Sequence, residues 1–220
     1  MDGAAIFMVI GIIINTAIYR KRNRFEDKLF FQLLLTEILI GLSDILVAIV
    51  NGRTFAGAQI INLTSFAFIY ISQAMFGLVM SVYLVKRLTG DEKKTKKMAL
   101  PLSIPLILII LMYLIGIPNG FFLTVDGENI YHYGPLYPIP VILMGLYALI
   151  ALILTVLYNR TRKEKGMIPF WLYLIPIAAM VVVSYVFKGI SLSAIGFAVV
   201  LAYMHTGVMN ETFYDEENRR

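Results

Sequence analysis

Residues 29–50 read LFFQLLLTEILIGLSDILVAIV, an apolar run of 22 residues in which Glu37 and Asp44 are the only charged side chains. The hydrocarbon core of a bilayer is about 30 Å thick, and roughly 20 apolar residues cross it as an α-helix. No water is present in that core to bond the backbone, so a spanning segment must satisfy its peptide groups internally. The run therefore predicts a transmembrane helix.

Comparable runs recur along the whole chain. Hydrophobic residues make up 59% of it and charged residues 15%, against about 25% charged residues in a typical soluble domain. A core of this size cannot hide so much apolar surface, so most of it must face lipid. We expect an all-α membrane protein, a seven-transmembrane helix bundle with spans at 4–19, 29–50, 62–85, 98–117, 138–158, 169–187 and 189–208.

The basic residues predict the orientation of this bundle. All 19 Lys and Arg except Arg53 and Lys188 fall on one side of the expected spans. Basic loops stay in the cytoplasm, so we expect the N-terminus outside and the C-terminus inside a multi-pass protein of the inner or plasma membrane. Residues 1–208 would form the transmembrane domain and 209–220 a cytoplasmic tail. Topology explains the net charge of +5, and no nucleic-acid partner is expected.

The substantial outer loop covers residues 118–137, between the fourth and fifth spans. Two β-prone segments flank Asp126-Gly127. Asp-Gly is typical of a two-residue hairpin turn, which needs positive φ. We expect a small extracellular β-hairpin over the outer end of the bundle.

Charge within the hydrocarbon is costly and points to function. Glu37 and Asp44 are seven residues apart, about 10.5 Å along one helix face. Asp44 lies in the outer half, where it could contact a ligand or pair with Lys188. The alternatives are a proton or ion relay, or interhelical hydrogen bonding with at least one acid protonated because burial raises a carboxyl pKa. Other polar residues expected on the interior are Asn15, Gln73, Ser184, Ser193 and His205, the last as a packed, hydrogen-bonded residue.

The motifs of soluble enzymes are missing from the sequence. There is no cysteine, no Ser-His-Asp set with usable spacing, no His-Glu-x-x-His and no glycine-rich phosphate loop. We therefore expect no enzyme, no cofactor and no metal. An intramembrane enzyme would need a polar catalytic pair within hydrogen-bond reach in the bundle.

Three stretches carry a family resemblance: Leu42–Leu46 with Asn51-Gly52-Arg53, the outer-loop segment Glu128–Tyr137, and Phe187–Leu192. Together they resemble the seven-helix N-terminal sensor regions of bacterial diguanylate cyclases and some histidine kinases, mostly from Firmicutes. That family has an acidic residue near the end of the second span and a loop of the form Glu-Asn-x-Tyr-x-Arg-Gly-Pro-Leu after the fourth. The resemblance covers nearly the whole chain, with Tyr133 standing where the family often has Arg.

The resemblance implies a membrane sensor without enzymatic activity of its own. A small-molecule, peptide or lipid-like ligand would bind in the outer half of the bundle, and the seventh helix would pass the signal to a cytoplasmic effector. The effector, a diguanylate cyclase or histidine kinase in the family, is expected as a missing or separate unit, and a homodimer in contact with membrane lipids is expected. The residues expected to bind the ligand are Asp44, Asn129, Tyr131, His132, Tyr133 and Lys188.

A small-solute or ion-coupled transporter is the main rival. In that interpretation Glu37 and Asp44 are the ion or proton sites. The sequence shows no obvious 3+3 inverted repeat of the kind that many transporters carry. We therefore favour the sensor as the function to test.

Overall fold

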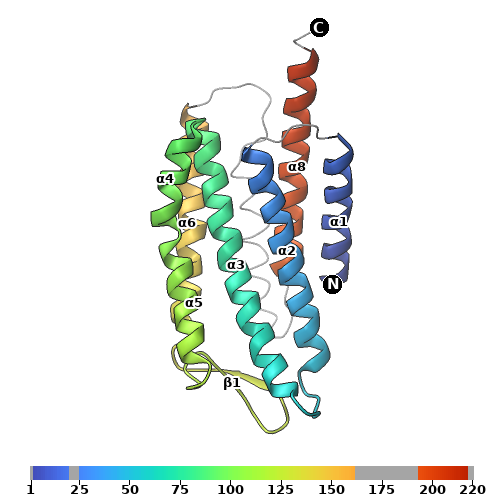
Figure 1. Ribbon diagram of the computed structural model, residues 1–220, viewed down its shortest axis with the longest axis vertical. Helices are drawn as coiled ribbons and strands as arrows, with labels where there is room; N and C mark the ends of the chain where they lie inside the picture. The colour runs from blue at the N-terminus through green and yellow to red at the C-terminus, as the bar shows by residue number, and fades with distance from the viewer. Residues whose placement is uncertain (1, 20–24, 162–192, 218–220) are drawn as a thin grey trace.

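The helices run along one long axis, and two short strands close one end of the bundle (Figure 1). The computed structural model describes residues 2–19, 25–161 and 193–217. Its elements, in chain order, are α1 Asp2–Tyr19, α2 Phe25–Val50, α3 Ala58–Thr89, α4 Glu92–Leu102, α5 Ile104–Gly116, β1 Leu123–Val125, β2 Tyr131–Tyr133, α6 Pro138–Thr161 and α8 Ser193–Glu217.

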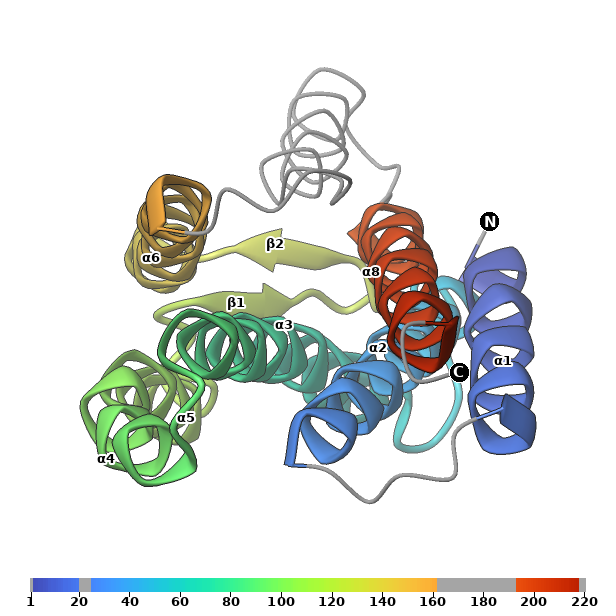
Figure 2. The same ribbon diagram turned by 90° about the horizontal axis from the view of Figure 1, so that it is seen from above.

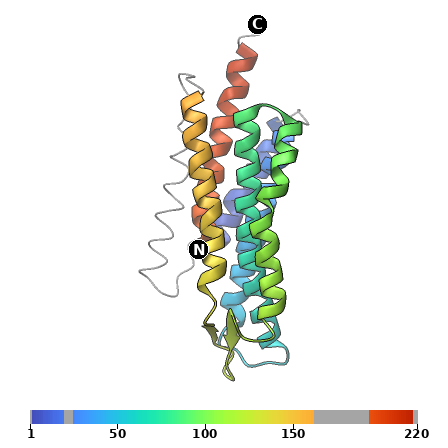
Figure 3. The same cartoon turned by 90° about the vertical axis from the view of Figure 1, so that its left-hand side faces the viewer.

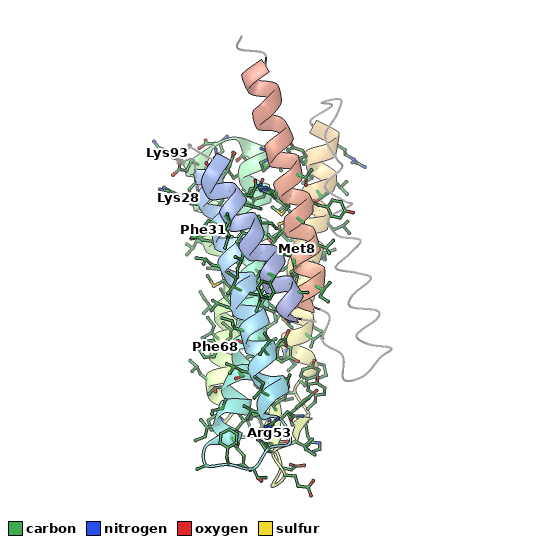
Figure 4. All side chains as sticks on the ribbon, turned by 90° about the vertical axis from the view of Figure 1, so that its right-hand side faces the viewer. Met8, Lys28, Phe31, Arg53, Phe68 and Lys93 are labelled. Atoms are coloured by element: carbon green, nitrogen blue, oxygen red, sulfur yellow. The ribbon has the colours of Figure 1, made fainter. Side chains whose placement is uncertain are left out.

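Four helical segments are long and apolar enough to cross a membrane: α2, α3, the α4–α5 pair and α6 up to Tyr158. Helices α1 and α8 contain shorter apolar segments, Gly3–Thr16 and Ala194–Thr206. Large apolar side chains cover the outer surface of the bundle, and Figure 4 shows them projecting outward along its length. The chain is therefore a helical membrane protein. The expected span 169–187 lies outside the described residues.

Polar capping defines the sharp turn between α3 and α4. Gly90 ends α3 with a φ of 68°, and its N–H donates to the Lys86 carbonyl at 2.8 Å. Asp91 then caps α4, since its side chain accepts from the Lys93 and Lys94 amides at 2.8 and 3.3 Å. Glycine suits the left-handed residue that ends a helix, and aspartate suits the position that begins one. Both helices extend beyond the apolar runs that predict them.

The single helix expected over 98–117 is two helices, and the reason lies in α6. Pro105 has no N–H to donate. The Tyr147 hydroxyl donates to the Leu102 carbonyl at 2.8 Å and accepts from the Leu106 amide at 3.1 Å. In an unbroken helix those two backbone groups would bond to each other. A side chain inserted into the backbone ladder is a known cause of a helix kink, so Tyr147 stabilises the break between α4 and α5.

Helix α3 is central, packing against α2 on one side and against α5 and α6 on the other (Figure 2). Its approach to α6 is close at Gly77, where an added Cβ would lie 2.7 Å from the Tyr147 Cβ. Small residues permit such contacts between helices in lipid, where van der Waals packing drives association. The position of Tyr147, and so of the α4–α5 break, therefore depends on a glycine in α3.

Strands β1 and β2 pair antiparallel between α5 and α6, with Leu123 opposite Tyr133 and Val125 opposite Tyr131. They lie across the end of the bundle where α5 ends and α6 begins (Figure 3). The connection between them is five residues long, 126–130, and its positive φ, 61°, belongs to Asn129. The expected two-residue Asp-Gly turn is wrong, because residue 129 takes the left-handed conformation expected at position 127.

Candidate functional site

The hairpin end of the bundle, which carries β1, β2 and the α2–α3 connection, contains a cluster of three asparagines. Asn62 of α3 and Asn129 of the hairpin loop are both buried, with 0% and 1% of their surface exposed. Asn62 Nδ2 donates to Asn51 Oδ1 at 3.2 Å and to the Asn129 carbonyl at 3.0 Å. The cluster thus joins the end of α2, the start of α3 and the hairpin loop.

Asn129 caps α2 from a distant part of the chain. Its Nδ2 donates to the Val50 carbonyl at 2.7 Å and to the Arg53 carbonyl at 3.0 Å. Its own carbonyl accepts from the Gly52 amide at 2.9 Å. The last carbonyls of a helix have no partner within the helix. The Val50 carbonyl accepts from the Arg53 amide at 3.0 Å, and the hairpin loop adds a second bond there and one to the Arg53 carbonyl.

Two more hydrogen bonds hold the hairpin against the α2–α3 connection. The Tyr131 amide donates to Asn51 Oδ1 at 3.3 Å, and Gln59 Nε2 donates to the Asp126 carbonyl at 2.9 Å. A three-residue pair of strands is marginal by itself. These contacts to α2 and α3 therefore fix where the hairpin lies.

The inner face of α2 carries polar residues at intervals of seven: Glu37, Asp44 and, just past the helix end, Asn51. Glu37 is 1% and Asp44 8% exposed. Both acids predicted to face the interior do so, and Asn51 continues their stripe to the hairpin. Val47, three residues from Asp44, packs against the core at this end.

Beside the asparagines lies a tyrosine cluster, defined as Tyr70 of α3, Tyr113 of α5, Tyr131 and Tyr133 of β2, and Tyr137 just before α6. Tyr133 stacks on Tyr137 with ring centroids 4.0 Å apart, and the Tyr70 and Tyr137 hydroxyls are 2.9 Å apart. Tyr70 stacks on Tyr113 at 5.6 Å. Tyrosines at a membrane boundary usually face lipid headgroups, whereas Tyr70 and Tyr113 are buried within the bundle.

The tyrosine cluster contains one unsatisfied group. Tyr113 is 2% exposed, and its buried hydroxyl has no hydrogen-bond partner among the described residues. The Phe122 ring packs beside it with centroids 5.8 Å apart. An unpaired buried hydroxyl costs about 1–3 kcal/mol. A polar group that bonds to the Tyr113 hydroxyl would therefore be stabilised here.

His132 lies on the outer surface of the hairpin, away from the tyrosine cluster. Its Nε2 is 2.9 Å from Asp126 Oδ2, and both side chains are exposed. The hydrogen bond from His132 holds the pKa of Asp126 below its ordinary value, and the Ile130 and Glu128 amides, which donate to Oδ1, add to the effect. This pair stabilises the turn of the hairpin.

The structure brings together Asn129, Tyr131 and Tyr133 among the residues expected to bind a ligand, at the end of the helix that carries Asp44. Both amide hydrogens of Asn129 bond to carbonyls within the protein. Lys188 and Ser184 lie outside the described residues, and Ser193 is the first residue of α8.

The remaining expected polar residues lie elsewhere in the bundle. Asn15 Oδ1 is 3.0 Å from His205 Nε2, across the contact between α1 and α8. His205 is therefore a packed, hydrogen-bonded residue, as its sequence position predicts. Gln73 is half-buried on α3.

The residues expected to bind a ligand do not include Asn51, Asn62, Tyr70, Tyr113 or Tyr137, although Asn51 and Tyr137 lie in the stretches that carry the family resemblance. One signal was available: Asn51 follows Asp44 by seven residues, the interval that separates Asp44 from Glu37. Asn62 belongs to an Asn-x-Thr sequon whose side chain is buried, so the match to a glycosylation motif is fortuitous. The tyrosines come from separate elements, and only the fold brings them together.

Comparison of the chain with protein-family models, with curated proteins and with solved structures found no match. Function must therefore be inferred from the geometry of the hairpin end. That geometry is a hairpin hydrogen-bonded to α2, beside a buried group of tyrosines.

Proposed function

We propose that the chain is a seven-helix membrane sensor that takes up a ligand at the hairpin end. The N-terminus and hairpin face outward, and the C-terminal end of α8 faces the cytoplasm. Ligand binding changes the position of the hairpin, and α8 passes the change to an effector such as a diguanylate cyclase or histidine kinase. The sequence resemblance described above supports this class of function.

The distribution of charge supports this orientation. Figure 4 shows Lys28 and Lys93 at the end of the bundle opposite Arg53. We call the end with Lys28 and Lys93 the basic end; it also contains the turn between α3 and α4. Cytoplasmic loops carry an excess of Lys and Arg. The basic end is thus the cytoplasmic side, and the hairpin end is outside.

The observation that carries the proposal is the pair of bonds from Asn129 to Val50 and Arg53. They make the end of α2 and the hairpin loop one hydrogen-bonded unit. A ligand that moves the hairpin must therefore break these bonds or move the end of α2. Such a ligand shifts the equilibrium only if it binds one arrangement better than the other.

Helix α2 also contacts the helix that would carry the output. The Phe30 ring stacks on His205 of α8 with centroids 6.2 Å apart, and α8 extends past the other helices at the basic end (Figure 1). Packed rigid helices can carry a displacement from one site to another. The proposed route runs from hairpin to α2 to α8.

Paired spin labels test this route directly. The chain has no cysteine, so labels at Lys97→Cys and Thr212→Cys report the distance between the middle of α4 and α8. Asn129→Ala removes the two side-chain bonds to Val50 and Arg53 and so loosens the hairpin from α2. It should shift the label distance by about 1–2 Å or broaden its distribution, the scale of interhelix shifts in switching proteins. Glu128→Ala, an exposed neighbour, is the control. Distance distributions unchanged by Asn129→Ala would count against the route.

A proton- or ion-coupled transporter is the second candidate, because Glu37 and Asp44 are both buried on the inner face of α2. Buried intramembrane acids are a feature of ion pathways. Purified protein in proteoliposomes distinguishes the two functions. Ion or solute flux that disappears in Glu37→Gln would establish transport and remove the reason to propose a sensor. Intact spin-label coupling with no flux would favour the sensor.

A further inference from the structure

The tyrosine cluster has the composition of a cation-binding site. Its members contribute aromatic faces, and the Tyr70–Tyr137 hydroxyl pair lies inside it. The face of an aromatic ring carries partial negative charge, so a cation within about 6 Å of its centre is attracted. Quaternary ammonium groups suit such sites because they present methyl groups and no hydrogen-bond donor to the rings.

The charges around the cluster also favour a cation. Among the described side chains at the hairpin end, Asp126 and Glu128 are acidic and Arg53 is basic. Asp44 lies on the inner face of α2 below them. Among the described residues of the hairpin loop and the α2–α3 connection, a positively charged ligand thus meets two acidic side chains and one basic one, a balance that raises its local concentration.

Tyr133 provides the route into the cluster. Its side chain is 53% exposed and lies over one face of Tyr137. The strand that holds it is three residues long. A cation can replace the Tyr133 ring on that face of Tyr137, with Tyr133 and Tyr131 then beside it, since these two rings already lie 5.7 Å apart edge to face.

Tyr113 indicates what else the ligand carries. Its hydroxyl is buried and finds no partner in residues 2–19, 25–161 and 193–217. Its ring stacks on Tyr70, which bonds to Tyr137. A hydroxyl or other polar group a few atoms from the cation would supply the missing partner. The cluster thus offers both aromatic faces and one polar contact at the inner side.

We infer that the tyrosine cluster binds a trimethylammonium group, either of a free solute such as choline or of a phosphatidylcholine headgroup. This inference rests on the proposed function, because it assigns a ligand class to the same end of the bundle. The Tyr137 ring holds the cation on the face that Tyr133 leaves, with Tyr133 and Tyr131 beside it. Tyr113 bonds to the polar group of the ligand.

Binding of choline to the full chain in nanodiscs tests the inference. The nanodiscs contain phosphatidylethanolamine and phosphatidylglycerol, so that no lipid supplies trimethylammonium. The neutral isostere 3,3-dimethylbutan-1-ol keeps the shape and hydroxyl of choline without its charge. Choline should bind at least about fivefold more tightly than the isostere, and its methyl proton resonance should move upfield in contact with aromatic faces.

Variants locate the site. Tyr137→Leu should weaken choline binding at least about fivefold, whereas Tyr137→Phe, which keeps the ring, should weaken it by less. Tyr203→Leu, an exposed tyrosine on α8, should leave binding unchanged. The upfield shift of the choline methyl resonance is measured on the unmodified protein. The inference can therefore be tested even if a variant fails to fold.

Several outcomes would overturn the inference: no choline binding at concentrations up to about 10 mM, equal affinity for the isostere, or equal loss of choline binding from Tyr203→Leu and Tyr137→Leu.

Adding phosphatidylcholine to the nanodiscs separates the two sources of trimethylammonium. Competition with free choline identifies the headgroup as a ligand, and its absence assigns the site to the solute. If choline binds but the Lys97–Thr212 distance does not respond, the site stands and the sensor function fails. If the distance responds to Asn129→Ala but choline does not bind, the sensor function stands and the trimethylammonium site fails.

Discussion

The side chain of Asn129 donates a hydrogen bond to the Val50 carbonyl, 79 residues earlier in the chain, at 2.7 Å. With its second bond to the Arg53 carbonyl, it makes the end of α2 and the hairpin loop a single structural unit. A loop asparagine, usually solvated, is here a buried capping group.

Removing this side chain should destabilise the hairpin end. Asn129→Ala loses two hydrogen bonds and places alanine at a φ of 61°, so we expect the free energy of unfolding to fall by about 2–4 kcal/mol. Asn129→Gly relieves the backbone strain and should recover about 1 kcal/mol of that loss. Unfolding in mixed micelles measures both. Equal stability of the alanine and native proteins would show that the cap contributes nothing.

The Tyr147 hydroxyl should stabilise the break between α4 and α5. Tyr147→Phe removes the bonds to the Leu102 carbonyl and Leu106 amide, so we expect a loss of about 1–2 kcal/mol. Exchange of the Leu106 amide with solvent deuterium should quicken. Tyr203→Phe, on the exposed surface of α8, is the control. Unchanged exchange at Leu106 would mean that the backbone bonds are held without the phenol.

Gly77 should be intolerant of a side chain. An added Cβ would lie 2.7 Å from the Tyr147 Cβ, so Gly77→Ala must push α3 and α6 apart, at a cost of about 1–3 kcal/mol. Gly145→Ala provides the matched control on α6, since its Cβ would meet no atom within 4 Å. Thermal unfolding of the two variants compares them. A stable Gly77→Ala protein would place the two helices farther apart than the structure does.

The turn of the hairpin should loosen in acid. The pKa of Asp126 is lowered in the folded state, chiefly by the hydrogen bond from His132. Its contribution is therefore fully present above the ordinary value of 3.8 and is lost as pH falls through the lower folded-state pKa. The Ile130 amide resonance, followed from about pH 6 to pH 2, should shift with this titration. Asp126→Asn should abolish the shift, and a shift that persists in that variant must come from another group.

Hydropathy predicts the long helices well, because apolar runs of bilayer length leave few alternatives. The runs 29–50, 62–85 and 138–158 lie within α2, α3 and α6. The true helices are longer, since charged and polar flanks such as residues 25–28 are compatible with helix but not with lipid. Hydropathy indicates which part of a helix can lie in lipid. The helix ends are instead set by capping residues such as Gly90 and Asp91.

The break in the fourth expected span and the asparagine cluster lay beyond sequence reasoning for one physical reason. Each depends on a side chain from a distant segment: Tyr147 enters the backbone of α4–α5, and Asn129 caps α2. Local patterns show Pro105 and the loop asparagine Asn129, but not the distant groups to which they are joined. By contrast, the burial of Glu37 and Asp44 follows from their spacing on one helix, which is a local property.

The orientation of the bundle is the central claim, and labelling of single cysteines in intact cells tests it most directly. Glu128→Cys on the hairpin, Lys94→Cys on α4 and Asp215→Cys near the end of α8 are each introduced into the natively cysteine-free chain. A membrane-impermeant maleimide should label residue 128 in intact cells and residues 94 and 215 only after the cells are opened. Labelling of residue 94 or 215 from outside, with residue 128 protected, would contradict the account.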